Sequence, residues 1–344
     1  MKIAIHHRPN SYSDLWIEYC QQHNVQYKIV DAYANDIITQ VADCDAFMWH
    51  FHHHIYKDVL YAKQLIYVIE KQLGKITYPD FNTCWHFDDK VGQKYLLESV
   101  SVPIVPTYIF FSQKDALEWI RHTTFPKVFK LRCGASASNV LLIKSPIQAK
   151  HIIDKAFNNG IKTFRFHEQI KERYTKYKQG LVSIRNLLGL IKMWALNNKP
   201  IEYYKYHPKE IGYVYFQDFI PNNDFDIRVF VVDNKAIAAK RINRENDFRA
   251  SGSGKLIYDK EEIDEDCIKI AFETKRKLKM QSVAFDFLRN TNNNWVITEI
   301  SYCRDNKNRS HTGYWTEDMQ WHECNNIDIC AWIIETVIEK ALKQ

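Results

Sequence analysis

The chain has 344 residues, of which 46% are hydrophobic and 26% charged, and it carries a formal net charge of +6. This length accommodates two or three domains, and no apolar run approaches the roughly 20 residues of a membrane-spanning helix. The charge tolerates a polyanionic small ligand such as a nucleotide, whereas no basic tail or recognition motif indicates nucleic acid. Eight scattered cysteines without a CxxC pair are typical of reduced thiols in a cytoplasmic protein, and the N-terminus lacks the apolar core of a signal peptide.

Strands and helices alternate at the N-terminus. Residues 2–5, 26–30 and 46–49 have the composition of short strands, and residues 13–23 that of a helix. This alternation predicts a parallel sheet covered by helices, and we expect an α/β domain at residues 1–87.

Four histidines, His50, His52, His53 and His54, follow the third of these strands. Three adjacent histidines converge on one ion only if the backbone is irregular, so a loop at the strand end is favoured over a metal site. A loop at the carboxyl end of a parallel strand can still line a cleft.

A helix is expected at residues 88–98, with Asp88 as its N-cap, and a short amphipathic helix at 115–122. A strand at 125–131 then leads into a loop of small residues at 133–139. Backbone N–H groups and hydroxyls of such a loop can enclose phosphates, while Lys130 supplies a positive charge. The alternative is a flexible turn beside an exposed lysine.

A strand at residues 213–220 precedes a hairpin at 225–242. Asp226 and Arg228 lie two residues apart, so they share one face of the first hairpin strand. Lys240 and Arg241 end the return strand, and Arg249 lies in the loop that follows. These cations indicate either a solvated surface or a clamp for an anion.

A second hairpin, at residues 283–301, carries two acids. A symmetrical turn at 290–294 places Asp286 opposite Glu299, and strand alternation puts Trp295, Ile297, Glu299 and Ser301 on one face. Opposed carboxylates repel each other, and a Mg²⁺ ion between them would remove that cost. The alternative is an exposed hairpin with two solvated acids.

The C-terminal part is expected to contain an aromatic, polar loop at 302–323 and a closing helix at 327–342. The loop carries Tyr314, Trp315, Trp321 and His322, which either stack on a sugar ring or pack within the protein.

The order of these segments resembles the ATP-grasp superfamily, which includes D-alanine–D-alanine ligases, glutathione synthetases and ribosomal-protein glutamate ligases. The resemblance rests on Lys90, the 125–130 strand with its small-residue loop, Gln217-Asp-Phe-Ile220, Asp226-Ile-Arg228, Lys240-Arg241, 246–251, Asp286 and Glu299-Ile-Ser301. It implies an α/β (α+β) architecture: an N-terminal α/β domain (1–87), a central α+β lid region (88–212) and a C-terminal α+β domain (213–344), with ATP held between the last two.

The resemblance also implies residue roles. Lys90 and Lys130 would contact the phosphates, under a flap that includes Gly134, Ser136 and Ser138. The hinge that recognises adenine would consist of Gln217, Asp218, Phe219 and Ile220. The γ-phosphate and an acyl phosphate would be held by Arg228, Arg241 and Arg249, and Mg²⁺ by Asp286, Glu299 and Ser301. Ser301 stands where the family usually has Asn, which puts a second Mg²⁺ in doubt.

The implied function is an ATP-dependent ligase that joins a small-molecule carboxylate to an amine through an acyl phosphate, with ATP and Mg²⁺ as cofactors. The Trp-rich C-terminal segment is suggestive of amidation of a sugar or nucleotide-sugar carboxylate in capsule or other surface-polysaccharide biosynthesis. Two alternatives are a kinase of a small molecule and a nucleotide-binding protein without turnover. We expect neither a nucleic-acid partner nor a membrane span, and the oligomeric state stays open.

Overall fold

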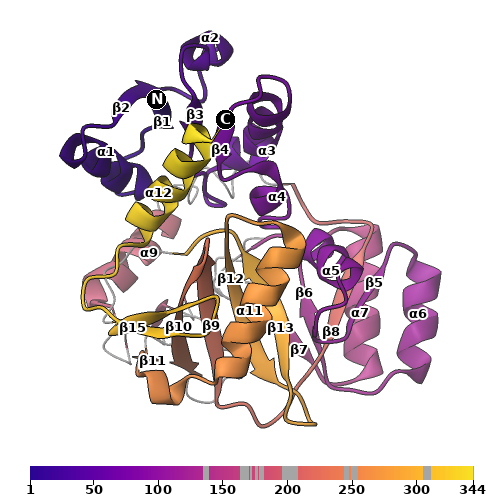
Figure 1. Ribbon diagram of the computed structural model, residues 1–344. Helices are drawn as coiled ribbons and strands as arrows, with labels where there is room; N and C mark the ends of the chain where they lie inside the picture. The colour runs from indigo at the N-terminus through magenta and orange to yellow at the C-terminus, as the bar shows by residue number, and fades with distance from the viewer. Residues whose placement is uncertain are drawn as a thin grey trace.

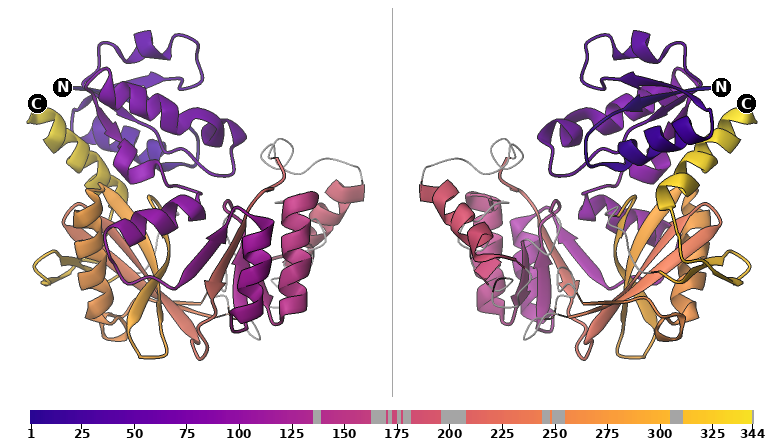
Figure 2. Two further views of the ribbon diagram at one scale, coloured as in Figure 1. Left: turned by 90° about the vertical axis from the view of Figure 1, so that its right-hand side faces the viewer. Right: turned by 90° about the vertical axis from the view of Figure 1, so that its left-hand side faces the viewer.

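The computed structural model describes residues 1–134, 139–162, 170, 173–174, 177, 182–195, 208–243, 248, 255–304 and 311–343. These residues form three sheets with helices packed on them (Figures 1 and 2). In this described part of the chain, no helix has both the length and the apolar character needed to cross a membrane.

The N-terminal domain is the predicted parallel sheet, in the order β2-β1-β3-β4. Its strands are β1 (Lys2–His6), β2 (Gln26–Val30), β3 (Ala46–Met48) and β4 (Ile76–Tyr78). Its helices are α1 (Tyr12–Gln22), α2 (Ile37–Val41), α3 (Tyr56–Lys71) and α4 (Phe81–Cys84). A further helix comes from the other end of the chain: α12 (Ile329–Leu342) packs against α1 and β4.

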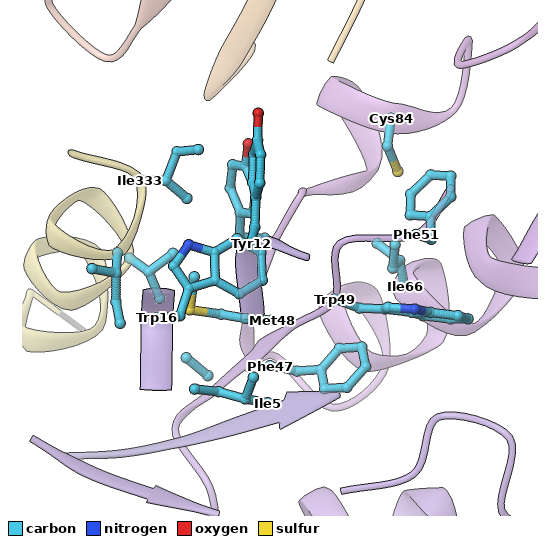
Figure 3. Close-up of a cluster of buried hydrophobic side chains, with 14 of the residues drawn as sticks. Ile5, Tyr12, Trp16, Phe47, Met48, Trp49, Phe51, Ile66, Cys84 and Ile333 are labelled. Carbon is cyan, nitrogen blue, oxygen red and sulfur yellow. The ribbon is translucent and has the colours of Figure 1, made fainter. Parts of the chain in front are cut away.

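The core of this domain is rich in aromatic residues (Figure 3). Trp16, Phe47 and Trp49 are fully buried, and Ile333 of α12 joins the same cluster. Burial of large rings supplies most of the apolar contact area of such a core. The N-terminal domain therefore includes α12, a helix that begins some 240 residues after the end of α4.

The central sheet is antiparallel, in the order β5-β8-β6-β7. Its strands are β5 (Thr107–Phe110), β6 (Lys127–Lys130), β7 (Val140–Ile143) and β8 (Val214–Asp218), and the helices of this region are α6 (Gln113–His122), α7 (Pro146–Asn158) and α9 (Ile184–Ala195). The predicted boundary at residue 213 separates β8 from the sheet to which its hydrogen bonds belong. The return strand of a sheet is not recognisable from local pattern alone, because its partners lie about a hundred residues earlier.

The large C-terminal sheet has the order β13-β12-β9-β10-β14-β15, and β11 pairs with β10. Its strands are β9 (Phe225–Val232), β10 (Lys235–Ile242), β11 (Leu256–Ile257), β12 (Ser282–Arg289), β13 (Trp295–Ser301), β14 (Gly313–Thr316) and β15 (Trp321–Glu323). Helices α5 (Lys90–Ser99) and α11 (Glu265–Leu278) and the short 3-10 helix η1 (Lys260–Glu262) accompany it. Both predicted hairpins, 225–242 and 283–301, are present.

The two faces of this sheet have different neighbours. Val229, Val231 and Phe285 pack on one face with α11, whereas Phe230 and Ala284 on the other face join the N-terminal core. Strand alternation then places Arg228 and Asp286 on the face opposite α11. That face borders the other two domains and carries the candidate site.

Candidate functional site

The site lies where α5, the central sheet and the C-terminal sheet approach one another. A small pocket there is lined by residues of all three, among them Lys90, Gln217 and Glu299.

Lys90 connects the parts of the site. It is 5% exposed, and its Nζ donates to the carbonyl oxygen of Gly134 at 2.7 Å and lies 3.1 Å from Oε1 of Glu299. Burial by itself would lower the pKa of Lys90, but the charges of Glu299 and Asp88 outweigh burial and raise it. Lys90 is therefore held as a cation at this junction.

The local sequence positions this lysine at the first turn of α5. Asp89, not Asp88 as predicted, is the N-cap and accepts the N–H of Gly92 at 2.9 Å. Asp88 has a φ of 54° and accepts the N–H of Gly134 at 2.7 Å. The prediction of Asp88 as the cap is wrong because two adjacent aspartates compete for that position, and the second takes it. Sequence reasoning missed the contact of Asp88 with the loop.

Lys130 is the second buried lysine. It ends β6 and is 9% exposed, and burial lowers its pKa to about 8, against the opposing charge of Glu299. Lys90 adds to the lowering. Both lysines thus feel the charge of Glu299, and Asp88 and Asp286 in addition favour the charged forms of Lys90 and Lys130, respectively.

Asp286 and Glu299 lie opposite each other, as predicted, but a symmetrical turn is not the reason, because the register that begins at Arg289 and Trp295 would by itself pair Asp286 with Thr298. The face assignment of their hairpin is wrong, however, because the register shifts beside Asp286 in a β-bulge. Trp295 and Ile297 point into the core under α11, whereas Glu299 and Ser301 lie on the opposite face. The extra residue turns Glu299 toward Lys90, and no pattern of residue types reveals such a bulge in advance.

Two arginines surround Asp286. Arg228, its cross-strand partner, donates from Nε and Nη2 to the two carboxylate oxygens at 2.7 Å each, and Nη2 of Arg241 lies 2.9 Å from Oδ2. Arg241 also forms a bidentate pair with Asp226 at 2.5 Å. Burial by itself would raise the pKa of Asp286, but the two guanidinium groups outweigh it and hold the pKa well below its usual range.

Two of the three arginines predicted to clamp an anion lie on the site face. Arg228 and Arg241 are on the site face, and the side chain of Arg228 is 37% exposed, whereas that of Arg241 is 9% exposed. Lys240 points to the other face and pairs with Glu262 at 2.6 Å. Arg249, Ser136 and Ser138 lie outside the described residues.

The acidic residues fit a magnesium ion. An ionised carboxylate has about four lone-pair sites. Asp286 uses three of them on the arginines, and Glu299 uses one on Lys90. The hydroxyl of Ser301 donates to the carbonyl oxygen of Cys303 at 2.9 Å, which leaves its own oxygen able to accept. Oxygen donors of this kind suit Mg²⁺. The side chains of Arg228, Arg241 and Lys90 already reduce the repulsion between the carboxylates of Asp286 and Glu299.

The predicted hinge occupies the crossing between two sheets. Gln217 and Asp218 end β8, and the chain then passes through Phe219 and Ile220 to β9 of the C-terminal sheet. Gln217 is 4% exposed and donates to Oγ1 of Thr107 at 3.2 Å, and Asp218 pairs with Lys127. Gln217 lines the pocket, so the start of the hinge borders the site.

A further pocket residue, Gln93, was missed from sequence. Its Oε1 accepts the N–H of Ile300 at 3.3 Å, which joins α5 to β13. Lys90, Gln93 and Leu97 are buried and lie three and four residues apart, the spacing of one helix face. That spacing is visible in the sequence and would have indicated that α5 packs beside the site.

The C-terminal aromatic residues form a hairpin, β14–β15, and not the loop that was expected. Trp315 is 1% exposed and packs edge-on against Trp321 at 4.4 Å, while Tyr314 stacks on His322 at 5.1 Å. Trp315 is thus packed within the protein, whereas Tyr314 and Trp321 are half-buried and His322 is exposed, so stacking of these three on a sugar ring stays a prediction.

Part of the chain matches a known protein family. Residues 209–312 match the family model described as a RimK-like ATP-grasp domain. No curated protein sequence matches the chain significantly.

Several solved structures have a similar fold. D-cycloserine synthetase DcsG has a TM-score of 0.57 and 12% identity, with 99% of this chain and 100% of that chain covered. The ATP-grasp ligase PsnB, in complex with a minimal precursor, Mg and ADP, has a TM-score of 0.54 and 11% identity over 99% and 98% of the two chains. A RimK domain ATP-grasp protein of Sphaerobacter thermophilus DSM 20745 has a TM-score of 0.52 and 13% identity over 87% and 90%. Residues 209–312 thus match an ATP-grasp domain, and the chain as a whole has an ATP-grasp fold.

Proposed function

We propose that the protein is an ATP-dependent ligase that joins a carboxylate to an amine through an acyl phosphate, with Mg²⁺ bound beside the ATP phosphates. The contact that supports this most directly is that of Lys90, whose ammonium group meets both the base of the small-residue loop and Glu299. One cation thus links the loop expected to cover the phosphates with the acid expected to hold the metal.

Three cations have a defined task in this proposal. Lys90 and Lys130 bind the phosphate oxygens of ATP, and the exposed part of Arg228 faces the γ-phosphate. Asp286, Glu299 and Ser301 would hold Mg²⁺, which would neutralise charge on the phosphates. Phosphoryl transfer depends mainly on positioning and charge neutralisation, and these groups supply both.

The chemistry needs two transfers. A substrate carboxylate oxygen attacks the γ-phosphorus, the bond to the β–γ bridging oxygen breaks, and ADP leaves. The amine nitrogen then attacks the acyl carbon, inorganic phosphate leaves, and the nitrogen loses a proton. The protein's cations hold the phosphate oxygens in both steps, so the same groups serve both transfers.

The acceptor substrates are not assigned by these contacts. The structural neighbours include a D-cycloserine synthetase and a ligase bound to a peptide precursor, and acceptor sites differ among proteins that share a fold. A sugar or nucleotide-sugar carboxylate stays a prediction. Cytoplasmic localisation likewise stays a prediction; all eight cysteines are free thiols.

A hydroxylamine trap tests the proposal. Protein, Mg-ATP, hydroxylamine and a panel of carboxylates, uronates and amino acids included, are incubated, and ADP and hydroxamate are measured. Substrate-dependent hydroxamate with ADP identifies an acyl phosphate and its carboxylate. ADP without hydroxamate contradicts the ligase and indicates a kinase, and ATP binding without either product across the panel points to a protein without turnover.

Glu299→Gln is the matching variant, with Glu262→Gln as its control. Loss of one charge-stabilising group typically slows a reaction about 100- to 1,000-fold. We expect this loss for Glu299→Gln and no change for Glu262→Gln, whose carboxylate pairs with Lys240 on the far face. Equal activity of both variants would contradict the role of Glu299.

A further inference from the structure

The histidines after β3 converge, although sequence spacing argued against it. One ring nitrogen from each of His52, His53 and His54 can be chosen so that all three lie within 4.8 Å of one another. Nε2 of His53 and Nε2 of His54 are 3.1 Å apart. The irregular backbone that convergence requires is present, because residues 53 and 54 form a turn between β3 and α3.

These distances are close to those of a metal site. Zn²⁺ binds imidazole nitrogen at about 2.0–2.1 Å, and tetrahedral geometry then separates two ligand nitrogens by about 3.3–3.4 Å. His53 and His54 need to open by only a few tenths of an ångström. Nδ1 of His52 accepts the backbone N–H of His54 at 3.2 Å, so His52 has to rotate and give up this hydrogen bond to bring a nitrogen inward. A metal ion would replace the proton that one of the two Nε2 atoms must now carry.

We propose that His52, His53 and His54 bind one divalent transition-metal ion, of the Zn²⁺ class, at the carboxyl edge of the N-terminal sheet. Imidazole nitrogen suits Zn²⁺, Cu²⁺ and Ni²⁺ and does not suit Mg²⁺. The site thus differs in donor chemistry from the oxygen site at Asp286 and Glu299, and it does not depend on the proposed ligase activity.

The backbone of the loop is held in place on both sides. Trp49 and Phe51 are 0% and 1% exposed, and Figure 3 shows them among the buried side chains. The fully buried carboxylate of Asp58 accepts the N–H of His52 at 2.6 Å and is paired with Nη1 of Arg8 at 2.8 Å. Ligands on a fixed backbone lose little conformational freedom on binding.

The neighbouring histidine does not belong to this set. His50 packs into the core instead: its Nδ1 lies 2.8 Å from Oγ of Ser11, and its ring stacks on that of Tyr12 with the ring centroids 4.0 Å apart. His52, His53 and His54 are only half-buried, so an ion can reach them. Three protein ligands leave a fourth position for water or another donor.

Metal titration of the untagged protein tests the proposal. The protein is freed of metal with a chelator and kept in excess Mg²⁺, so that the oxygen site does not compete, and Zn²⁺ is titrated in a calorimeter. The variant is His53→Ala/His54→Ala, and the control is His122→Ala/His151→Ala, which removes two exposed histidines from α6 and α7.

We expect one equivalent of Zn²⁺ to bind the wild type and the control. Loss of outer-shell partners costs about 10–100-fold in metal affinity, so removal of two ligands should cost at least 100-fold. Wild type without a one-to-one complex, or a variant that binds as tightly as the control, would overturn the proposal.

A second measurement needs no variant and covers the case in which the substitutions impair folding. X-ray absorption of the Zn²⁺-loaded wild type should show a shell with about three imidazole nitrogens at 2.0–2.1 Å. A shell of sulfur, or of carboxylate oxygen without imidazole, would refute the site.

Discussion

Replacement of Asp226 by Asn should destabilise the protein far more than its position near a strand end suggests. Arg241, whose side chain is 9% exposed, makes two contacts to Asp226 and one to Asp286. Removal of one partner from a buried ion pair costs about 3–5 kcal/mol, because the other charge stays buried. Arg241 retains its contact with Asp286, so we expect the lower end, about 3 kcal/mol.

Glu262→Gln is the matched comparison, because Glu262 pairs with Lys240, the residue next to Arg241 on β10. The side chain of Glu262 is 47% exposed, and pairs screened by solvent contribute about 0–1 kcal/mol. Urea unfolding followed by circular dichroism gives the change in unfolding free energy of both variants. Asp226→Asn within 1 kcal/mol of Glu262→Gln would refute the view that Arg241 depends on Asp226 for its burial.

Two further predictions concern other parts of the chain. Burial lowers the pKa of Lys130 from 10.5 to about 8, so the ATP affinity of the wild type, measured by calorimetry, should fall as the pH rises through 8. The affinity of Lys130→Arg should change little between pH 7 and 9. The same dependence of ATP affinity on pH in both proteins would contradict this. A Cβ at Gly313 would collide with the ring of Trp321 and the carbonyl oxygen of His322, so Gly313→Ala should cost about 1–3 kcal/mol. An unchanged melting temperature for that variant would contradict this and show that the β14–β15 hairpin can shift to accommodate the added Cβ.

Features with local causes could be predicted from the sequence. The N-terminal alternation of strands and helices and the two hairpins follow from residue type and spacing over short windows. The pairing of Asp286 with Glu299 does not follow from the turn alone, because the register that begins at Arg289 and Trp295 would pair Asp286 with Thr298 if no bulge were present. The order of these segments along the chain, through its resemblance to ATP-grasp proteins, then indicated one overall fold.

Features that depend on distant or irregular backbone could not be predicted. The bulge that turns Glu299 toward Lys90, the pairing of β8 with β5 and β6, and the turn that gathers His53 and His54 all depend on contacts that no short window contains. The competition between Asp88 and Asp89 for one N-cap is decided by the loop at Gly134, which lies far along the chain.

The placement of α12 has a consequence for biosynthesis. Ile333 and Val337 fill the core of the N-terminal domain, beside Trp16. On a ribosome residues 2–84 emerge well before α12, the helix that packs against their core. We therefore expect this part of the nascent chain to expose apolar surface until α12 has been translated, and chaperones that recognise such surface would find it there during that interval.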